Sequence, residues 1–261
     1  MLTLTNIQKT FAPGTVNEKK ALQGIDLHLD AGDFVTILGS NGAGKSTLFG
    51  AIAGSFRPDT GTVVLDGRDI TSLPDYRRSK FIGRLFQDPL RGTAPAMTIE
   101  ENLALAYLRA SHSRSPFSTI TKKDRQEFRD KLAMLDLGLE DRMNHPVGLL
   151  SGGQRQALTL LMATLVTPKL LLLDEHTAAL DPATAEKVLE LTKRIVAENN
   201  ITCLMITHNV PSALSLGNRT IMMKDGRVVL ELAGTRRAAM TPEDLLKAFH
   251  VETDRILFSA E

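Results

Sequence analysis

The sequence predicts an α/β fold built around a buried parallel sheet, and three observations support this prediction. The four-leucine run at 170–173 fits a strand that is buried on both faces of a parallel sheet. A second apolar strand, at 33–38, runs through a glycine-rich loop into an expected helix over 45–53. Hydrophobic and polar residues alternate at 25–29, which is typical of a strand with one buried face. We therefore expect a mixed fold with parallel and antiparallel strands.

The N-terminal elements are mostly strands. Alternation predicts antiparallel strands near 2–7, 23–30 and 62–66, around the apolar strand at 33–38. Another apolar strand is expected at 81–86. A mainly helical region follows over about 90–150, and the string Thr98-Ile99-Glu100-Glu101 at its start is a capping box, in which two side chains satisfy backbone groups at a helix N-terminus.

The C-terminal elements return to the α/β pattern. We expect a strand at 170–174, a helix over 182–198 and a strand at 201–207, followed by a hairpin whose turn is Asp225-Gly226. A last helix is expected to start at Thr241. The polar, basic segment 109–118 has no periodicity, so an exposed loop is favoured over a contact with lipid headgroups or a partner.

The glycine-rich loop has the pattern G-x-x-x-x-G-K-S between a strand and a helix, which is the order that a phosphate-binding loop requires. Its glycines allow backbone N–H groups to point at phosphate oxygens, and the helix N-terminus adds a partial positive charge. We expect Lys45 to reach the β- and γ-phosphates, Ser46 to ligate Mg²⁺ and Thr47 to bind the α-phosphate. The phosphate-binding residues are Gly39, Ser40, Asn41, Gly42, Ala43, Gly44, Lys45, Ser46 and Thr47.

Two carboxylates, Asp174 and Glu175, follow the leucine-rich strand at its carboxyl end. Ligands of parallel α/β sheets bind at this end of the strands. We expect Asp174 to hold Mg²⁺ through a water molecule. Glu175 is expected to polarise the attacking water, a role that needs a carboxylate within one hydrogen bond of that water.

A second glycine-rich string, Leu150-Ser151-Gly152-Gly153-Gln154, would by itself indicate only a flexible turn and a helix cap. Combined with the two motifs above, in this order, it makes the chain resemble the ATP-binding-cassette (ABC) ATPases over nearly its whole length. The resemblance implies a P-loop NTPase fold with a RecA-like core, an antiparallel β part and an inserted helical subdomain. It implies ATP as the nucleotide and Mg²⁺ as the cofactor.

In this family the second string binds the γ-phosphate of an ATP molecule held by the opposite subunit, so the resemblance implies a homodimer. By position, Ser151 and Gly153 would contact that phosphate. Gly152 and Gln154 would shape the loop, and a helix over 154–166 would direct its N-terminal dipole at the phosphate.

Four further residues match the family by position. Gln87 matches the glutamine that touches Mg²⁺ and water and senses the transport partner, and His208 matches the histidine on the γ-phosphate. Asp181 matches the loop that communicates across the dimer, and Phe11 the aromatic residue that stacks on adenine. Each also has a structural interpretation: an exposed loop glutamine, a strand-end histidine, a helix N-cap and a packed phenylalanine.

The residue after Glu175 departs from the family, because His176 stands where proline is most common. Two interpretations remain open. A histidine close to the γ-phosphate would tune the base, whereas a tolerated substitution in a turn would have no chemical role. The second interpretation is favoured.

Composition limits the function. The net charge of +1 favours no association with nucleic acid. The one cysteine, Cys203, lies inside an apolar strand, which indicates a buried thiol and a reducing compartment. No signal peptide and no apolar run long enough for a membrane span are visible. We therefore expect a cytoplasmic protein, peripheral on the inner face of the membrane, that works with separate membrane chains.

The expected domain organisation is a single ABC ATPase domain over 1–261. Residues 1–89 and 151–240 would form the α/β core with its antiparallel part. Residues 90–150 would form the helical signature subdomain, and 241–261 a C-terminal helix and tail. No regulatory domain of ordinary size is expected after the hairpin.

The motifs together predict a subunit that binds and hydrolyses ATP to power solute transport, with import favoured. Its expected partners are a second copy of the chain, integral membrane permease subunits and, indirectly, an extracytoplasmic solute-binding protein. A finer resemblance is to an importer subgroup linked to lipoprotein-captured solutes such as aromatic amino acids. The alternative is a soluble assembly or remodelling ATPase of the iron–sulfur scaffold type. A nucleic-acid repair ATPase is disfavoured, because no sustained heptad run is visible.

Overall fold

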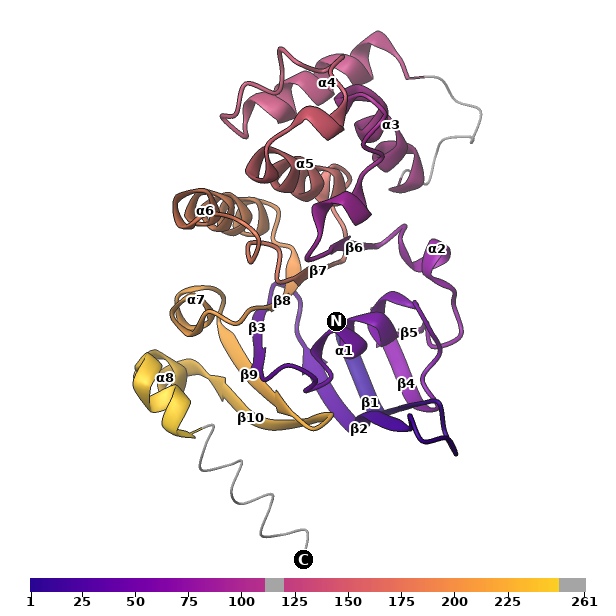
Figure 1. Ribbon diagram of the computed structural model, residues 1–261, viewed down its shortest axis with the longest axis vertical. Helices are drawn as coiled ribbons and strands as arrows, with labels where there is room; N and C mark the ends of the chain where they lie inside the picture. Colours follow the sequence, from indigo (N-terminus) through magenta and orange to yellow (C-terminus); the bar gives the residue numbers. More distant parts are fainter. Residues whose placement is uncertain (111–119, 249–261) are drawn as a thin grey trace, which may run out of the picture. The chain divides into compact units, whose positions relative to one another are not determined.

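The computed structural model describes residues 1–110 and 120–248 (Figure 1). The chain consists of two compact units. Unit 1 comprises Met1–Arg78 with Thr202–Glu261, and unit 2 is Ser79–Ile201. The part of the chain that the structure describes contains no helix long and apolar enough to cross a membrane. Of the loop predicted at 109–118, the first two residues end a helix and the others lie outside the described residues.

Unit 1 contains an antiparallel sheet with the strand order β2-β1-β4-β5. Leucines at alternate positions of β1 and β2 pair across the two strands, as Leu2 with Leu29 and Leu4 with Leu27, and all four are buried. This shared face explains the alternation in the sequence. The strands are β1 (Leu2–Phe11), β2 (Lys19–Leu29), β4 (Thr60–Leu65) and β5 (Arg68–Asp69).

The other strands of unit 1 surround the central strand β3 (Phe34–Gly39), which pairs in parallel with β8 and β9. β9 continues into β10 through Asp225-Gly226, and both turn residues have positive φ, so the predicted hairpin is confirmed. Cys203 is buried in β8, and burial raises the pKa of its thiol. The remaining strands are β8 (Thr202–Ile206), β9 (Arg219–Lys224) and β10 (Arg227–Ala233).

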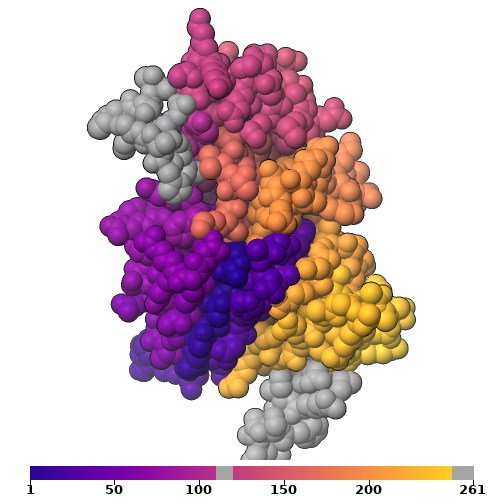
Figure 2. Space-filling view, turned by 180° about the vertical axis from the view of Figure 1, so that it is seen from behind, coloured from indigo at the N-terminus to yellow at the C-terminus, as the bar shows by residue number. Residues whose placement is uncertain are grey.

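The helices of unit 1 pack on these sheets. A core cluster of Leu38, Met222, Leu232 and Leu245 joins β3, β9 and β10 to the helix at 242–248. In Figure 2 the indigo surface of the N-terminal strands borders the orange-to-yellow C-terminal part of the same unit, where β10 packs against β2. The helices are α1 (Lys45–Ala53), α2 (Asp75–Arg78), α7 (Val210–Ser215) and α8 (Gly234–Ala238).

Unit 2 combines two parallel strands with a group of helices. β6 (Ile82–Leu85) pairs with β7 (Leu170–Asp174), and all five residues of β7 are buried, as its leucines predict. α5 (Gly152–Thr164) packs against the other three α-helices (Figure 1). The remaining helices are the 3₁₀ turns Pro89–Gly92 and Val147–Leu149, α3 (Ile99–Ala110), α4 (Lys122–Ala133) and α6 (Pro182–Glu198).

The predicted bounds of α1, β7 and α6 are those of the structure. The strands predicted near 2–7 and 23–30 are longer than predicted, because β1 continues to Phe11 and β2 already begins at Lys19, where the two strands pair. Helix α5 starts two residues before the predicted position 154, because Ser151 rather than a later residue caps it. The capping box at Thr98 is confirmed, since Thr98 and Glu101 exchange hydrogen bonds in both directions. The mixed α/β fold class is confirmed.

Candidate functional site

The predicted phosphate-binding loop connects β3 to α1 and encloses the ammonium group of Lys45. This side chain is only 6% exposed. Its Nζ atom donates hydrogen bonds to the carbonyl oxygens of Gly39 (2.7 Å) and Ser40 (3.0 Å). A buried cation at a helix N-terminus is a strong attractor for anions.

The glycines of the loop are required by geometry. Gly39, Gly42 and Gly44 have φ angles of 153°, 84° and 97°, a region that residues with a β-carbon rarely adopt. A β-carbon on Gly39 would collide with the carbonyl of Met223, and one on Gly44 would lie 2.5 Å from the carbonyl oxygen of Ala21. Residues with a β-carbon therefore do not fit at these positions.

The hairpin turn between β9 and β10 is hydrogen-bonded to this loop. The backbone N–H of Gly226 donates to the carbonyl of Ala43 (3.0 Å), and the carbonyl of Gly226 accepts from the N–H of Gln23 in β2 (2.9 Å). The loop is thereby bonded to the turn of the β9–β10 hairpin, which is distant in sequence, and through this turn to β2.

His208 leaves its strand at the same sheet edge as the phosphate-binding loop. β3 and β8 are parallel neighbours, with Ile37 opposite Ile206, and the N–H of Thr207 donates to the carbonyl of Ile37 (3.1 Å). Because parallel strands share an edge for their carboxyl ends, unit 1 brings exposed His208 and the loop together.

Phe11 ends β1 and is 40% exposed, and the Nζ atom of Lys9 lies 5.7 Å from the centroid of its ring. The ring of Phe56 contacts it edge-on, with the centroids 5.4 Å apart. Phe11 pairs across the sheet with Lys19. The Nζ atom of Lys19 lies 3.8 Å from the position a β-carbon on Gly42 would occupy, so the side chain of Lys19 reaches the loop.

In unit 2, Gln87 and the predicted acidic pair leave adjacent parallel strands at one edge. The register pairs Leu85 of β6 with Leu173 of β7, so Gln87 follows one strand and Asp174 ends the other. Gln87 is exposed and Asp174 is 8% exposed. Burial lowers the pKa of Arg84 in β6, while the charge of Asp174 acts in the opposite direction.

Glu175 occupies a strained backbone conformation directly after β7. Its φ angle is 46°, which is uncommon for a residue with a β-carbon and is frequent at functional sites. Its carbonyl accepts from the N–H of Ala178 (3.0 Å), which closes a turn. The side chain is partly exposed, as a residue that handles water requires.

His176 points into the protein and is 3% exposed. Its Nε2 atom lies 3.1 Å from the hydroxyl of Thr192 in α6. Burial lowers the pKa of His176 from 6.5 to about 4, so the ring is neutral at physiological pH. This geometry supports a structural role within the turn.

The second glycine-rich string forms the N-terminus of α5. Ser151 is the N-cap, its Oγ accepts from the N–H of Gln154, and its own N–H donates to Gln154 Oε1, both at 3.2 Å. Arg155 donates to the carbonyls of Gly148 (3.2 Å) and Leu150 (2.9 Å), which fixes the preceding turn. The helix N-terminus at Ser151 is thus fully capped and exposed.

The two glycines of this string let α5 closely approach α6 and the segment just before it. A β-carbon on Gly153 would collide with the methyl group of Thr184, and one on Gly152 would lie 3.3 Å from Leu180. Asp181 caps α6 by accepting from the N–H of Thr184 (3.1 Å). Hydrogen bonds from the side chain and then the backbone N–H of Thr184 lower the pKa of the exposed Asp181 carboxylate. Unit 2 therefore brings the string and Asp181 together.

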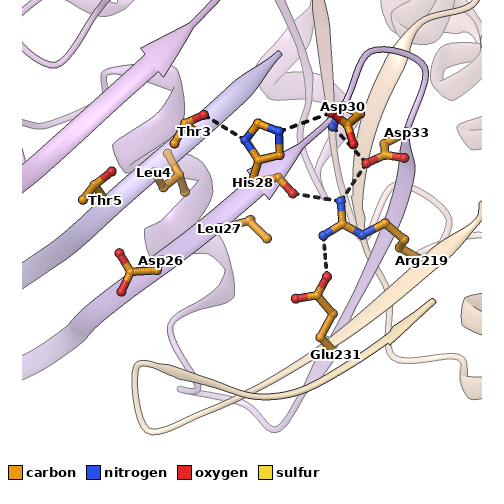
Figure 3. Close-up of a pocket in the computed structure, with 10 residues that line it drawn as sticks. All are labelled: Thr3, Leu4, Thr5, Asp26, Leu27, His28, Asp30, Asp33, Arg219 and Glu231. Atoms are coloured by element: carbon orange, nitrogen blue, oxygen red, sulfur yellow. Dashed lines mark hydrogen bonds and ion pairs between the residues drawn. The ribbon is translucent and has the colours of Figure 1, made fainter.

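A separate shallow pocket in unit 1 contains none of the predicted site residues (Figure 3). At its edge, Arg219 donates to Asp33 (2.7 Å), the His28 carbonyl (2.8 Å) and Glu231. Burial opposes the ionisation of Asp33, but hydrogen bonds from Asn218 and Arg219 lower its pKa. These contacts join the two sheets of unit 1. The lining residues are Thr3, Leu4, Thr5, Asp26, Leu27, His28, Asp30, Asp33, Arg219 and Glu231.

Sequence reasoning missed three residues near the predicted site. Lys19 approaches the phosphate-binding loop, Phe56 contacts Phe11, and Thr192 binds His176. No short motif marks them, because each reaches its partner through the tertiary fold. Of these contacts, only the one between His176 and Thr192 had any indication in the sequence, namely the unusual histidine at position 176.

Comparison with known proteins gives consistent results. A family model described as "ABC transporter" matches residues 22–178. A tyrosine transport ATP-binding protein of Clostridioides difficile is 42% identical over 253 residues, covering 95% of this chain and 98% of that protein. A phosphonates import ATP-binding protein of Halobacterium salinarum is 38% identical, covering 88% and 78%. A dimeric ATP-binding cassette in a post-hydrolysis state, bound to ADP and Pi, has a TM-score of 0.77 at 32% identity, covering 89% and 98%.

Proposed function

The chain belongs to the ABC transporter family as an ATP-binding subunit with ATPase activity, and on this basis we propose that it powers the import of an aromatic amino acid. The observation that carries the proposal is the likeness to a tyrosine transport ATP-binding protein over 95% of this chain. The relatives described above are transport proteins, and nothing in them favours the iron–sulfur scaffold alternative.

The loop from Gly39 to Thr47 is proposed to bind the triphosphate. Its glycines direct backbone N–H groups at the phosphates, and the ammonium of Lys45 neutralises the charge of the β- and γ-phosphates. Mg²⁺ would be held by the Ser46 hydroxyl, by Gln87 and, through water, by Asp174, all of which are the oxygen ligands that this ion prefers. The exposed face of Phe11 would stack on adenine.

Hydrolysis is proposed to proceed by in-line attack of water on the γ-phosphate. Glu175 accepts a hydrogen bond from this water and aims it, while Lys45 and His208 stabilise the charge that develops on the phosphate oxygens. Mg²⁺ would supply further neutralisation of the phosphate charge. The strained backbone of Glu175 is a conformation that is frequent at catalytic positions.

The active form is proposed to be a homodimer that contains two ATP molecules. Each would be held by the phosphate-binding loop of one subunit and by Ser151, Gly152, Gly153 and Gln154 of the other. The N-terminus of α5, capped by Ser151, would offer backbone N–H groups to the γ-phosphate. The Asp181 loop, packed against the same glycines, would transmit closure between subunits.

The proposed partners are two integral membrane permease subunits and, indirectly, an extracytoplasmic binding protein. The chain would act on the cytoplasmic side of the membrane, peripheral to the permeases, with the Gln87 loop sensing them. We also propose that residues 90–150 act as the helical signature subdomain of a single ATPase domain, within an α/β core of 1–89 and 151–240, and that 241–261 form its C-terminal helix and tail.

Replacement of Glu175 by Gln tests the catalytic assignment. The variant should bind ATP and accumulate as a closed dimer, while phosphate release falls by orders of magnitude, because the base is lost and the shape is kept. Glu186→Gln, at an exposed position of α6, is the matched control and should hydrolyse ATP normally. Unchanged turnover in Glu175→Gln would contradict the role of Glu175.

Uptake of radiolabelled tyrosine in cells lacking this gene tests the transport assignment. Uptake should fall and should return with the intact gene but not with the Glu175→Gln variant. Uptake of a phosphonate in the same cells is the control and should be unaffected. Normal tyrosine uptake without the gene would overturn the substrate proposal and leave the ATPase assignment intact.

A further inference from the structure

His176, next to the proposed base, is fixed to helix α6 by a buried hydrogen bond. Its Nε2 atom lies 3.1 Å from Oγ1 of Thr192, and the two side chains are 3% and 0% exposed. The contact joins the turn after β7 to the middle of α6. Buried polar side chains are in the large majority of cases hydrogen-bonded, and here each of the two has the other as a partner.

The direction of this hydrogen bond follows from the other contact of Thr192. The hydroxyl of Thr192 lies 2.8 Å from the carbonyl oxygen of Val188, to which it donates its only proton. The same oxygen can then only accept from His176, so the ring carries its proton on Nε2. The chain of donors runs from His176 through Thr192 to the backbone of α6.

The residue that precedes His176 has a backbone conformation that needs support. Glu175 has a φ angle of 46°, and strained conformations of this kind persist when the surrounding structure holds them. On one side, strand β7 ends at buried Asp174. On the other side, the first side chain that can hold the turn is His176, anchored on α6.

We propose that His176 is a positioning residue for Glu175, and that it acts through the hydroxyl of Thr192. The bond keeps the turn in the conformation that directs the Glu175 carboxylate at water. The ring is turned toward α6 and buried, so it does not itself act on the nucleotide. This inference rests on the proposed catalytic role of Glu175.

Substitutions of Thr192 separate positioning from stability, because the chain offers a matched control. Thr164 in α5 is also buried and donates to the carbonyl four residues earlier (Leu160, 2.8 Å). Thr192→Val and Thr164→Val should lower the melting temperature. Only Thr192→Val should lower kcat, by about threefold to tenfold for one lost hydrogen bond, with little change in the KM for ATP. Thr192→Ser should restore kcat.

The double variant His176→Phe with Thr192→Val gives the decisive readout. Replacing both partners by apolar groups of similar shape removes the unsatisfied polar group, so the melting temperature should recover relative to Thr192→Val alone. If His176 positions Glu175, kcat stays low in this stable variant. Recovery of kcat together with stability would overturn the inference.

The Glu175→Gln variant keeps this test independent of the proposed function. If Glu175→Gln abolishes turnover and the double variant retains normal kcat, Glu175 is the base and the positioning role of His176 is wrong. If Glu175→Gln retains turnover, the catalytic assignment itself is wrong.

Discussion

Gly153 of α5 lies against the methyl group of Thr184 in α6, so closely that a β-carbon at position 153 has no room. Thr184 also donates its backbone N–H to Asp181 (3.1 Å). The glycine-rich string and the Asp181 loop are therefore packed as one assembly within unit 2. A displacement of either one must move the other.

Gly153→Ala should impair ATP hydrolysis, because the added methyl forces α5 away from α6. Thr184→Ser removes the colliding methyl and keeps the backbone cap, so the double variant should recover most of the lost rate. Steady-state phosphate release measures both. Failure of Thr184→Ser to rescue would show that Gly153 is needed for a reason other than its contact with α6.

Lys45→Ala should impair ATP binding by the monomer, whereas Ser151→Arg should impair closure of the dimer. Without Lys45 the phosphate-binding loop loses its buried cation, so ATP affinity of the monomer should fall. Ser151→Arg should leave monomer affinity nearly unchanged and block dimer closure, because Ser151 is proposed to meet the partner's nucleotide. Calorimetric titration and size-exclusion chromatography check the two effects. An equal loss of monomer ATP affinity in both variants would contradict a nucleotide site that is shared between two subunits.

Arg78→Met should strongly destabilise unit 1. The side chain is 1% exposed and donates to four backbone carbonyls, those of Ala51, Ile52, Thr71 and Leu73. Methionine has no donor for these carbonyls, so the substitution should lower the unfolding free energy by at least about 3 kcal/mol.

The neighbour of Arg78 provides the control for this experiment. Arg77 is exposed on the same short helix, and Arg77→Met should change stability by less than about 0.5 kcal/mol. Urea denaturation followed by circular dichroism compares the two. Similar losses in both variants would show that burial of Arg78 is not the cause.

Phe11→Ala should weaken the binding of ATP and ADP about tenfold, as expected for the loss of one stacking platform. Phe56→Ala should weaken binding less, because Phe56 supports the ring of Phe11 edge-on at 5.4 Å. Tyr76→Ala, an aromatic residue 63% exposed in the same unit, is the control. Fluorescence titration with a labelled nucleotide measures affinity, and normal affinity of Phe11→Ala would refute stacking.

Unfolding free energy should fall as the pH decreases from about 6.5 to about 4. Burial lowers the pKa of His176 from 6.5 to about 4, so the unfolded chain binds a proton there that the folded chain does not. The stabilisation is complete above the unfolded pKa and is lost as pH falls toward the folded one, by up to about 3 kcal/mol. His176→Gln should show a flatter pH profile in urea titrations; an unchanged slope would contradict this account.

Local signals in the sequence predicted the elements that carry the motifs. The bounds of α1, β7 and α6 agree because glycine, consecutive leucines and the Asp181-Pro182 cap mark them directly. The short elements α2, α7 and α8 were not predicted, since four to six residues show no clear periodicity.

The residues that contact the site through the tertiary fold could not be predicted from the sequence, for a different reason. From the sequence, Arg78 would be interpreted as an exposed cation. Its burial depends on hydrogen bonds to carbonyls at the C-terminal end of α1. Lys19 reaches the loop from β2, where it pairs with Phe11 after an irregularity in the register of β1 and β2. Such placements are set by the fold and leave no pattern in the neighbouring residues.

The hydrogen bonds from Gly226 to Ala43 and from Gln23 to Gly226 have an energetic consequence for nucleotide capture. A loop that is already fastened loses little conformational entropy when phosphate arrives, so less of the interaction energy goes into ordering backbone. The remainder is available to draw a second subunit onto the nucleotide. The small turn at residues 225 and 226 thereby increases the binding free energy that is available for closing the dimer.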